Sequence, residues 1–196
     1  ESLIPLICIN HLKNKETLIV GSSMPIRDLD RFVSNSINKE ITLYSNRGVS
    51  GIDGVISTAL GITLNSKYNH FLVIGDLSFL HDINGLMLAQ RYHFNLTIIV
   101  VNNNGGGIFS LLPIKKKVKN KFEEFWTTPH GLDFKYLAKL YDMKYFKATS
   151  IPTLTTRLNN CNNIKGIKII DFKTNIKANE KYYKKLQSNI NNFFKK

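Results

Sequence analysis

The stretch HFLVIGDLSFLHDINGLMLAQRYHFNLTIIVVNNNGGGIF, residues 70–109, decides the fold. An apolar run at 71–74 ends in Gly75-Asp76, a helical pattern follows, and a second apolar run at 96–101 ends in three asparagines and three glycines. This succession predicts a strand, a helix and a second strand. Because a crossover between parallel strands is right-handed, both strands end at one edge of the sheet, where open α/β folds bind ligands.

The residues that follow these two strands are suited to a metal-bound diphosphate. Mg²⁺ prefers oxygen ligands in octahedral geometry and often shares them with phosphates. Asp76 offers a carboxylate, Asn103 an amide oxygen, and Gly105 a backbone carbonyl. The glycines allow positive φ and a close approach of the backbone, and the N–H groups of Leu77 and Ser78 open the predicted helix. The sequence therefore predicts a Mg²⁺-diphosphate site.

Three stretches together resemble a known family. They are SNRGVSGIDG (45–54), GDLS (75–78) and NNNGGGIFSLLP (102–113). Gly-Asp followed at this distance by Asn-Asn resembles the thiamine diphosphate enzymes. The three stretches in this order are similar to one branch of them, the 2-succinyl-5-enolpyruvyl-6-hydroxy-3-cyclohexene-1-carboxylate synthase (MenD) family. Most thiamine diphosphate enzymes have Gly where this chain has Leu77, but the MenD family also lacks that Gly, which favours the narrower family.

The resemblance implies the C-terminal, thiamine diphosphate-binding domain of a transferase. Such an enzyme decarboxylates 2-oxoglutarate and adds the succinyl-semialdehyde carbanion to isochorismate, in menaquinone or phylloquinone biosynthesis. The implied cofactors are thiamine diphosphate and Mg²⁺, or Mn²⁺ in its place. The metal ligands expected from the residues are Asp76, Asn103 and Gly105. The likeness extends from about residue 18 to 112 and weakens towards residue 173.

Further polar side chains follow two other predicted strands, at 17–20 and 41–44. Arg binds carboxylates through two parallel hydrogen bonds, and both implied substrates carry carboxylates. The resemblance places the matching positions in the active site, so we expect Ser23, Arg27 and Arg47 to bind substrate. An ion pair of these arginines with a neighbouring Asp is the structural alternative.

The cofactor-binding residues expected from motif and resemblance together are Ser23, Asp76, Leu77, Ser78, Asn103, Gly105, Gly106, Ile108 and Phe109. The resemblance implies that Ile108 and Phe109 pack against the cofactor rings, whereas ordinary core packing is the alternative. We interpret Asp82, inside the predicted helix, as structural.

The glutamate that activates the cofactor in this superfamily lies on a separate N-terminal domain. The glutamates Glu40, Glu123, Glu124 and Glu180 stand in no matching motif, and the resembled enzymes are far longer than 196 residues. We therefore expect no catalytic residue in this chain and little activity from the chain alone. The expected partners are an N-terminal pyrimidine-binding domain and further copies in a dimer or tetramer.

The pattern along the whole chain predicts a doubly wound, mainly parallel α/β sheet with helices on both faces. Additional strands are predicted at 144–147 and 166–172, and helices at 25–35, 51–65, 133–141 and 152–160, while 114–130 shows no clear period. The predicted domains are a linker or incoming segment (1–16), a thiamine diphosphate- and Mg²⁺-binding domain (17–173) and a basic tail (174–196).

Composition admits two rival interpretations of the net charge of +13. The excess lies in residues 115–121 and in the tail, where it could bind nucleic acid, although abundant Lys, Asn and Ile also indicate an AT-rich genome. The function has two further alternatives. One is a different thiamine diphosphate enzyme, such as an acetohydroxyacid synthase, and the other is a remnant that has lost its catalytic half. The sequence has no apolar run long enough to span a membrane and no signal-peptide pattern, so we expect a bacterial cytoplasm or a plastid stroma.

Overall fold

A computed structural model describes residues 1–33, 38–118 and 120–194. The strands are β1 (Thr17–Val20), β2 (Thr42–Tyr44), β3 (His70–Gly75), β4 (Asn95–Asn102), β5 (Lys144–Ala148) and β6 (Gly166–Lys173). The α-helices are α1 (Ile4–His11), α2 (Met24–Phe32), α3 (Val55–Thr63), α4 (Asp76–His81), α5 (Ile114–Lys117), α6 (Phe134–Leu140), α7 (Ile151–Cys161) and α8 (Ile176–Phe193). Of the other helical segments, η1 (Ile83–Gln90) and η2 (Gly107–Leu111) are 3₁₀ helices and η3 (Glu123–Thr127) is a π-helix.

The chain divides into two compact units. Unit 1 comprises residues 1–102 and 133–173, and unit 2 comprises residues 103–132 and 174–196. Residues 103–132, which the sequence analysis includes in the 17–173 domain, therefore group with the tail. Residues 1–16 contain α1, whose buried side chains belong to the core of unit 1.

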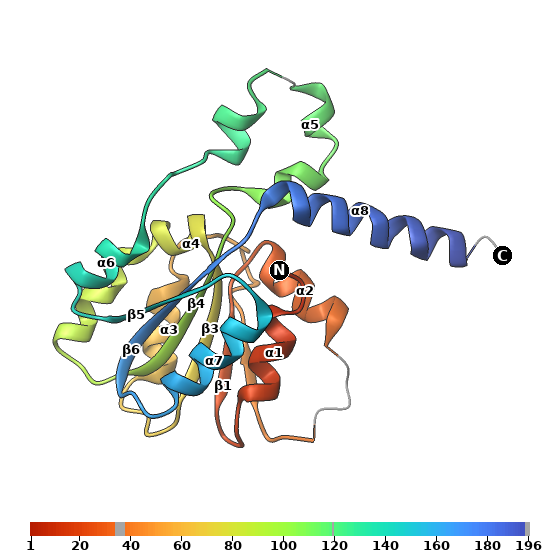
Figure 1. Ribbon diagram of the computed structural model, residues 1–196. Helices are drawn as coiled ribbons and strands as arrows, with labels where there is room; N and C mark the ends of the chain where they lie inside the picture. Colours follow the sequence, from red (N-terminus) through yellow and green to blue (C-terminus); the bar gives the residue numbers. More distant parts are fainter. Residues whose placement is uncertain (34–37, 119, 195–196) are drawn as a thin grey trace. The chain divides into compact units, whose positions relative to one another are not determined.

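Unit 1 is built on a six-stranded sheet in the order β2-β1-β3-β4-β6-β5, in which all the described pairs are parallel (Figure 1). This confirms the predicted doubly wound α/β fold. From β1 the chain adds β2 on one side and β3 on the other, so the direction of winding reverses between β1 and β3. The carboxyl ends of strands at such a reversal form the crevice in which open α/β folds bind ligands.

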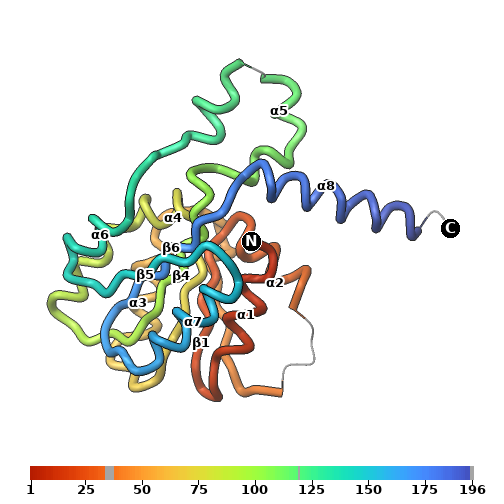
Figure 2. Tube along the Cα trace, in the orientation of Figure 1, coloured from red at the N-terminus to blue at the C-terminus, as the bar shows by residue number. Residues whose placement is uncertain are grey.

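Helices cover both faces of this sheet, which is why β3 and β4 are continuous apolar runs. On one face Leu72 and Ile74 of β3 pack in a cluster with α3, α4 and α6. On the other face Phe71 and Val73 pack with α1, α2 and α7, and the tube in Figure 2 shows α1 beside α7. Side chains alternate between faces along a strand, so each buried strand contributes to both clusters.

The helix predicted after Asp76 is interrupted at Asp82, where α4 ends and the 3₁₀ segment η1 follows. The Asp82 carboxylate accepts hydrogen bonds from the backbone nitrogen of Ser57 at 2.7 Å and from its hydroxyl at 2.9 Å. These bonds connect the junction between α4 and η1 to the first turn of α3. Asp82 therefore has a structural role, as the sequence analysis interprets it.

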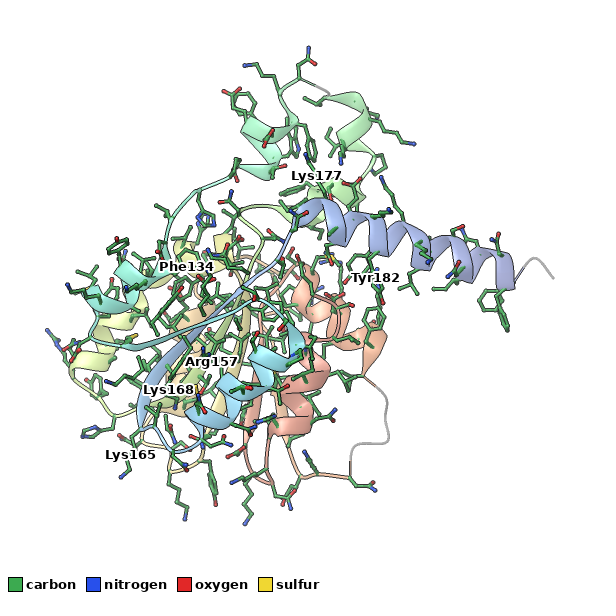
Figure 3. The ribbon with its side chains drawn as sticks, viewed as in Figure 1. Phe134, Arg157, Lys165, Lys168, Lys177 and Tyr182 are labelled. Atoms are coloured by element: carbon green, nitrogen blue, oxygen red, sulfur yellow. The ribbon has the colours of Figure 1, made fainter. Side chains whose placement is uncertain are left out.

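Unit 2 contains the tail as the 18-residue helix α8. Glu180 of this helix is only 8% exposed and accepts hydrogen bonds from Lys115 and Lys184. Burial alone would raise the pKa of Glu180, but the hydrogen bonds and charges of the two lysines outweigh it and lower the pKa. Along α8, Lys177 and Tyr182 are exposed (Figure 3). Within the described residues, no helix is both long and apolar enough to cross a bilayer.

Candidate functional site

The carboxyl ends of β1 and β3 lie side by side at the reversal of the sheet. Val20 pairs with Val73, and the backbone nitrogen of Gly21 extends this pairing by donating to the Val73 carbonyl oxygen at 2.8 Å. A Cβ at Gly21 would lie 3.4 Å from both the Val73 carbonyl oxygen and the Ile74 side chain. The segment that leads to Ser23 is therefore held against β3 near Asp76.

Ser23 has an unusual backbone conformation at the start of α2. Its φ of 74° and ψ of −133° lie outside the regions that residues with a Cβ ordinarily adopt. The Arg27 guanidinium donates to the Ser23 carbonyl oxygen at 2.7 Å, one turn into the helix. Strained residues of this kind persist where surrounding structure fixes them, and they cluster at functional sites.

Arg47 lies in the loop after β2, and side-chain hydrogen bonds connect this loop to β1 and α3. Ser45 donates to the Val20 carbonyl oxygen at 2.7 Å, and Asn46 donates to the Thr58 hydroxyl at 3.0 Å. The Arg47 side chain itself is exposed. Across residues 1–33, 38–118 and 120–194, neither Arg27 nor Arg47 forms an ion pair, so the structural alternative for these arginines is not realised.

Asp76 is 2% exposed and occupies the first position of α4. Its Oδ1 accepts a hydrogen bond from the backbone N–H of Leu77 at 2.7 Å. The sequence predicts that this N–H binds a diphosphate, but in this structure it binds the Asp76 carboxylate. The Ser78 hydroxyl donates to the Ile52 carbonyl oxygen at 2.6 Å. The first turn of α4 is therefore held by one hydrogen bond within the turn and by another to the segment before α3.

Unit 2 opens with Asn103, directly after the last residue of β4. Asn104 has a φ of 67°, which Asn tolerates better than most residues, and its Oδ1 accepts the backbone N–H of Gly131 at 2.8 Å. Gly105 follows with a φ of 142°, a conformation that favours glycine. The asparagine and glycine tract is therefore a defined turn within unit 2.

Gly105 and Gly106 are needed because another part of unit 2 approaches them closely. A Cβ on Gly105 would lie within 2.1 Å of the Thr127 carbonyl oxygen, and one on Gly106 within 2.5 Å of the Trp126 carbonyl oxygen. The Gly106 nitrogen also donates to the Thr127 carbonyl oxygen at 2.7 Å. In this structure the close approach is made by residues 126–127, in place of the phosphates that the sequence analysis expects.

Ile108 and Phe109 belong to η2, and both are partly buried. The Phe109 ring lies against Gly106, at 2.8 Å from the position of a Cβ there. The Ser110 hydroxyl donates to the Gly107 carbonyl oxygen at 2.8 Å and closes the turn. Phe109 thus packs on the glycine tract itself.

A buried network that the sequence analysis missed supports the end of β4. Asp171 of β6 is fully buried and accepts hydrogen bonds from Asn102 Nδ2 at 3.0 Å and from the Tyr145 hydroxyl at 2.9 Å, while Lys173 lies 3.3 Å away. Burial, followed by the hydrogen bond to Asp171, raises the pKa of Tyr145. The available signal was the single Asp in the apolar strand GIKIIDFK.

The donor chemistry fits a hard cation that also binds phosphate. Among the described residues, no three His, Cys, Asp or Glu side chains gather as a metal-binding group. The predicted ligand set includes only one such residue, Asp76, together with an amide and a backbone oxygen, which is the mixture that Mg²⁺ accepts when a phosphate completes its coordination.

Comparison with known proteins defines the class. Residues 28–172 match the family described as thiamine pyrophosphate enzyme, C-terminal TPP binding domain. The chain belongs to this family. The solved thiamine diphosphate-dependent 4-hydroxybenzoylformate decarboxylase of Rhodococcus jostii RHA1 shares the fold, with a TM-score of 0.68 and 17% identity over 89% of this chain and 32% of that one.

The particular relatives are synthases. The chain is 46% identical over 179 residues to the 2-succinyl-5-enolpyruvyl-6-hydroxy-3-cyclohexene-1-carboxylate synthase of Listeria innocua, covering 91% of this chain and 30% of the relative. It is 39% identical over 192 residues to the Staphylococcus haemolyticus protein of the same name, covering 97% and 34%. The chain therefore spans about a third of the length of these relatives.

Proposed function

We propose that this chain is the cofactor-binding C-terminal part of a synthase that decarboxylates 2-oxoglutarate and transfers the remaining four-carbon unit to isochorismate, in menaquinone or phylloquinone biosynthesis. The observation that carries the proposal is that GDLS and NNNGGG begin at the last residues of the neighbouring strands β3 and β4. The relatives named for this reaction, which match over nine-tenths of the chain, support it.

In this proposal Asp76, Asn103 and the Gly105 carbonyl are the protein ligands of Mg²⁺, or of Mn²⁺ in its place. When bound, thiamine diphosphate supplies the electron sink for decarboxylation of a 2-oxo acid. The chain orients it through the backbone around Ser78 and Gly106, and through packing by Ile108 and Phe109. Its binding requires residues 126–127 to move or the phosphates to approach from another side, because those residues now cover the glycines.

Substrate binding in this proposal relies on Ser23, Arg27 and Arg47. Both arginines are exposed and form no ion pair with a protein carboxylate in the described chain, so their guanidinium groups remain available for a substrate carboxylate. An N-terminal domain would supply the activating glutamate, within a homodimer or homotetramer. We assign the enzyme to the cytoplasm of a bacterium, as the bacterial source of its relatives suggests.

Isothermal titration calorimetry tests the cofactor assignment directly. We expect thiamine diphosphate to bind the chain when Mg²⁺ is present and to bind at least tenfold more weakly in excess EDTA. Thiamine without phosphates is the matched control and should show no dependence on Mg²⁺. Metal-independent binding, or equal binding of thiamine, would contradict the proposal.

A product analysis tests the reaction. The chain is combined with the N-terminal two thirds of the Listeria innocua relative and incubated with 2-oxoglutarate plus isochorismate, or with pyruvate alone. Consumption of the first pair, dependent on both polypeptides, supports the proposal. Conversion of pyruvate alone would favour an acetohydroxyacid synthase or another 2-oxoacid enzyme. Turnover by the chain alone would show that it does not need an N-terminal domain.

A further inference from the structure

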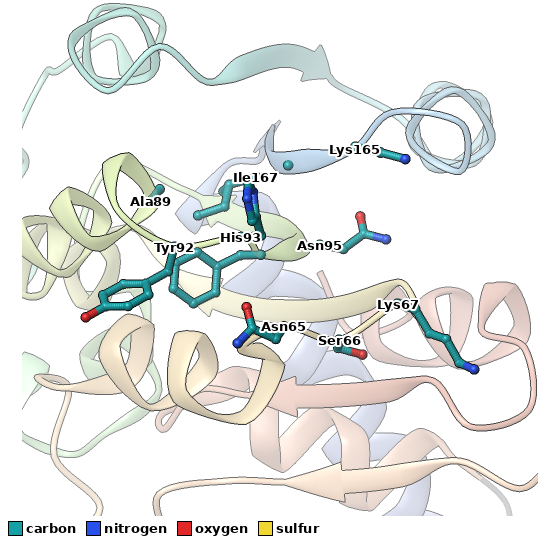
Figure 4. Close-up of a pocket in the computed structure, with 11 residues that line it drawn as sticks. Asn65, Ser66, Lys67, Ala89, Tyr92, His93, Asn95, Lys165 and Ile167 are labelled. Atoms are coloured by element: carbon teal, nitrogen blue, oxygen red, sulfur yellow. The ribbon is translucent and has the colours of Figure 1, made fainter.

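A pocket of about 670 Å³ opens in unit 1 at the edge of the sheet where β4 and β6 begin (Figure 4). Asn95 and Gly166, the first residues of these two strands, pair in the sheet and both line the pocket. Because all the strands are parallel, this edge is opposite to the one that bears Ser23 and Asp76. The pocket is therefore separate from the proposed cofactor-binding loops of unit 1.

The pocket is lined by positive and not by negative side chains. Lys67 and Lys165 are among its lining residues, and the lining contains no Asp or Glu from the described chain. Lys165, Asn95 and Lys67 follow one another along the same side of the pocket in Figure 4. A concave surface with one sign of charge concentrates ligands of the opposite sign.

The Asn95 carboxamide is fixed from behind by a buried cation. Lys168 is fully buried, and its Nζ donates to Asn95 Oδ1 at 2.7 Å. Because Lys can only donate, the Asn95 oxygen must face Lys168 and the Nδ2 group must point away from it. Nδ2 has no protein acceptor in the described part of the chain. The core therefore sets the direction of the Asn95 carboxamide at this edge of the sheet.

The remaining lining is apolar. Phe94 and Ile167 are 7% and 6% exposed, so they form a firm wall anchored in the core, and Ala89 and Tyr92 continue it. A bare inorganic anion would leave this wall uncovered. Pockets of this size that combine an apolar wall with a few directed polar groups are typical sites for small organic ligands.

We propose that this pocket binds a small organic anion, a carboxylate carried on a compact apolar ring or chain. The carboxylate accepts hydrogen bonds from Asn95 Nδ2, Lys67 and Lys165, and the apolar part covers Phe94 and Ile167. The site does not depend on the proposed function, because it involves none of the residues assigned to the cofactor or to the substrates.

Benzoate is the probe, and benzamide is its neutral match. We follow the backbone amide resonances of the ¹⁵N-labelled chain at low ionic strength while each compound is added. We expect benzoate to shift the resonances of residues 65–67, 92–95 and 165–167 with a dissociation constant of about 1 mM or tighter. Benzamide should leave these resonances unchanged, and excess thiamine diphosphate with Mg²⁺ should not displace benzoate.

Variants distinguish a specific binding site from nonspecific attraction of the anion to a basic protein. Lys67→Gln and Lys165→Gln should each weaken benzoate binding about tenfold, as expected for a hydrogen bond to a charged group, whereas Lys139→Gln on α6 should not change it. Asn95→Asp keeps an oxygen for Lys168 but replaces the donors by a negative charge, and it should abolish binding. Absence of shifts, equal binding of benzamide, or unchanged binding by Asn95→Asp would overturn the proposal.

Discussion

The backbone nitrogen of Gly21 donates to the Val73 carbonyl oxygen at 2.8 Å, one residue beyond the last paired residue of β1. This bond joins the two strands between which the sheet reverses its winding. It holds the segment ending in Ser23 beside the segment ending in Asp76, although about fifty residues separate them in the sequence. The substrate-binding and metal-binding proposals for unit 1 therefore concern neighbouring loops.

Asp76→Asn should weaken Mg²⁺-dependent binding of thiamine diphosphate roughly 100-fold, about 3 kcal/mol, because a charged hard ligand is replaced by a neutral one. Calorimetric titration measures this. Asp142→Asn is the matched control, since Asp142 is exposed and has a positive φ that Asn adopts readily. Unchanged affinity in Asp76→Asn would remove Asp76 from the metal site.

Gly105→Ala should open the turn that residues 126–127 cover. The added Cβ would meet the Thr127 carbonyl oxygen, and φ at this position favours glycine, so we expect a local loss of about 2–4 kcal/mol. Tryptic cleavage at the lysines of residues 115–121 should become much faster. Gly61→Ala in α3, where nothing lies within 4 Å of the new Cβ, should instead raise stability by up to about 1 kcal/mol. Equal cleavage of the two variants would contradict the close approach.

Stability should depend on Lys168 between pH 8 and pH 9. Burial lowers the pKa of Lys168 to about 8, although the nearby Cys161 and Glu16 partly oppose this. In this interval the unfolded chain keeps the lysine proton while the folded chain releases it, so the unfolded state binds more protons and stability rises with pH, by about 1 kcal/mol.

Lys168→Met should remove this rise, as measured by urea unfolding at the two pH values. Lys139→Met, at an exposed position, should leave the rise intact. Lys139→Met leaves the buried thiols in their native surroundings, whereas Lys168→Met also removes the charge that partly lowers the pKa of Cys161, which burial raises to about 11. A rise that persists in Lys168→Met would show that another group titrates there.

Tyr145→Phe should destabilise unit 1 by about 1–2 kcal/mol, because the fully buried Asp171 carboxylate loses one of its donors. Urea unfolding at neutral pH measures the loss. Tyr136→Phe, at a residue that is 71% exposed, should change stability by less than about 0.5 kcal/mol. If both variants were equally stable, the Asp171 network would not contribute to the fold.

Much of the fold follows from the sequence because its elements are long and strongly periodic. The apolar runs that became β3, β4 and β6 were predicted to within a residue or two. Asp133, the first residue of the predicted helix 133–141, caps α6 by accepting from the Lys135 nitrogen at 3.0 Å. Segment 114–130, which shows no clear period, contains α5 and η3. These short helices depend on contacts within unit 2 and leave no regular pattern.

The motifs of the candidate site could be recognised in the sequence, but the groups that hold those motifs in place could not. Three hydrogen-bonded pairs do so: Asp82 with Ser57, Asn102 with Asp171, and Gly106 with Thr127. Each of these bonds joins segments that are distant in sequence, and no periodicity records such a pairing. The use of the Leu77 N–H by Asp76 was also unexpected, because it depends on the side-chain conformation of one residue.

The sequence by itself determined the succession of parallel strands and helices, and it determined which residues follow the strand ends. Hydrophobic periodicity and the stereochemistry of glycine act over a few residues, so both can be read along the chain. Only the tertiary structure decided that the sheet reverses between β1 and β3, that residues 126–127 cover Gly105, and that Lys168 fixes Asn95 beside a pocket. These features arise when distant segments pack together and bury polar groups, which must then find their partners across the fold.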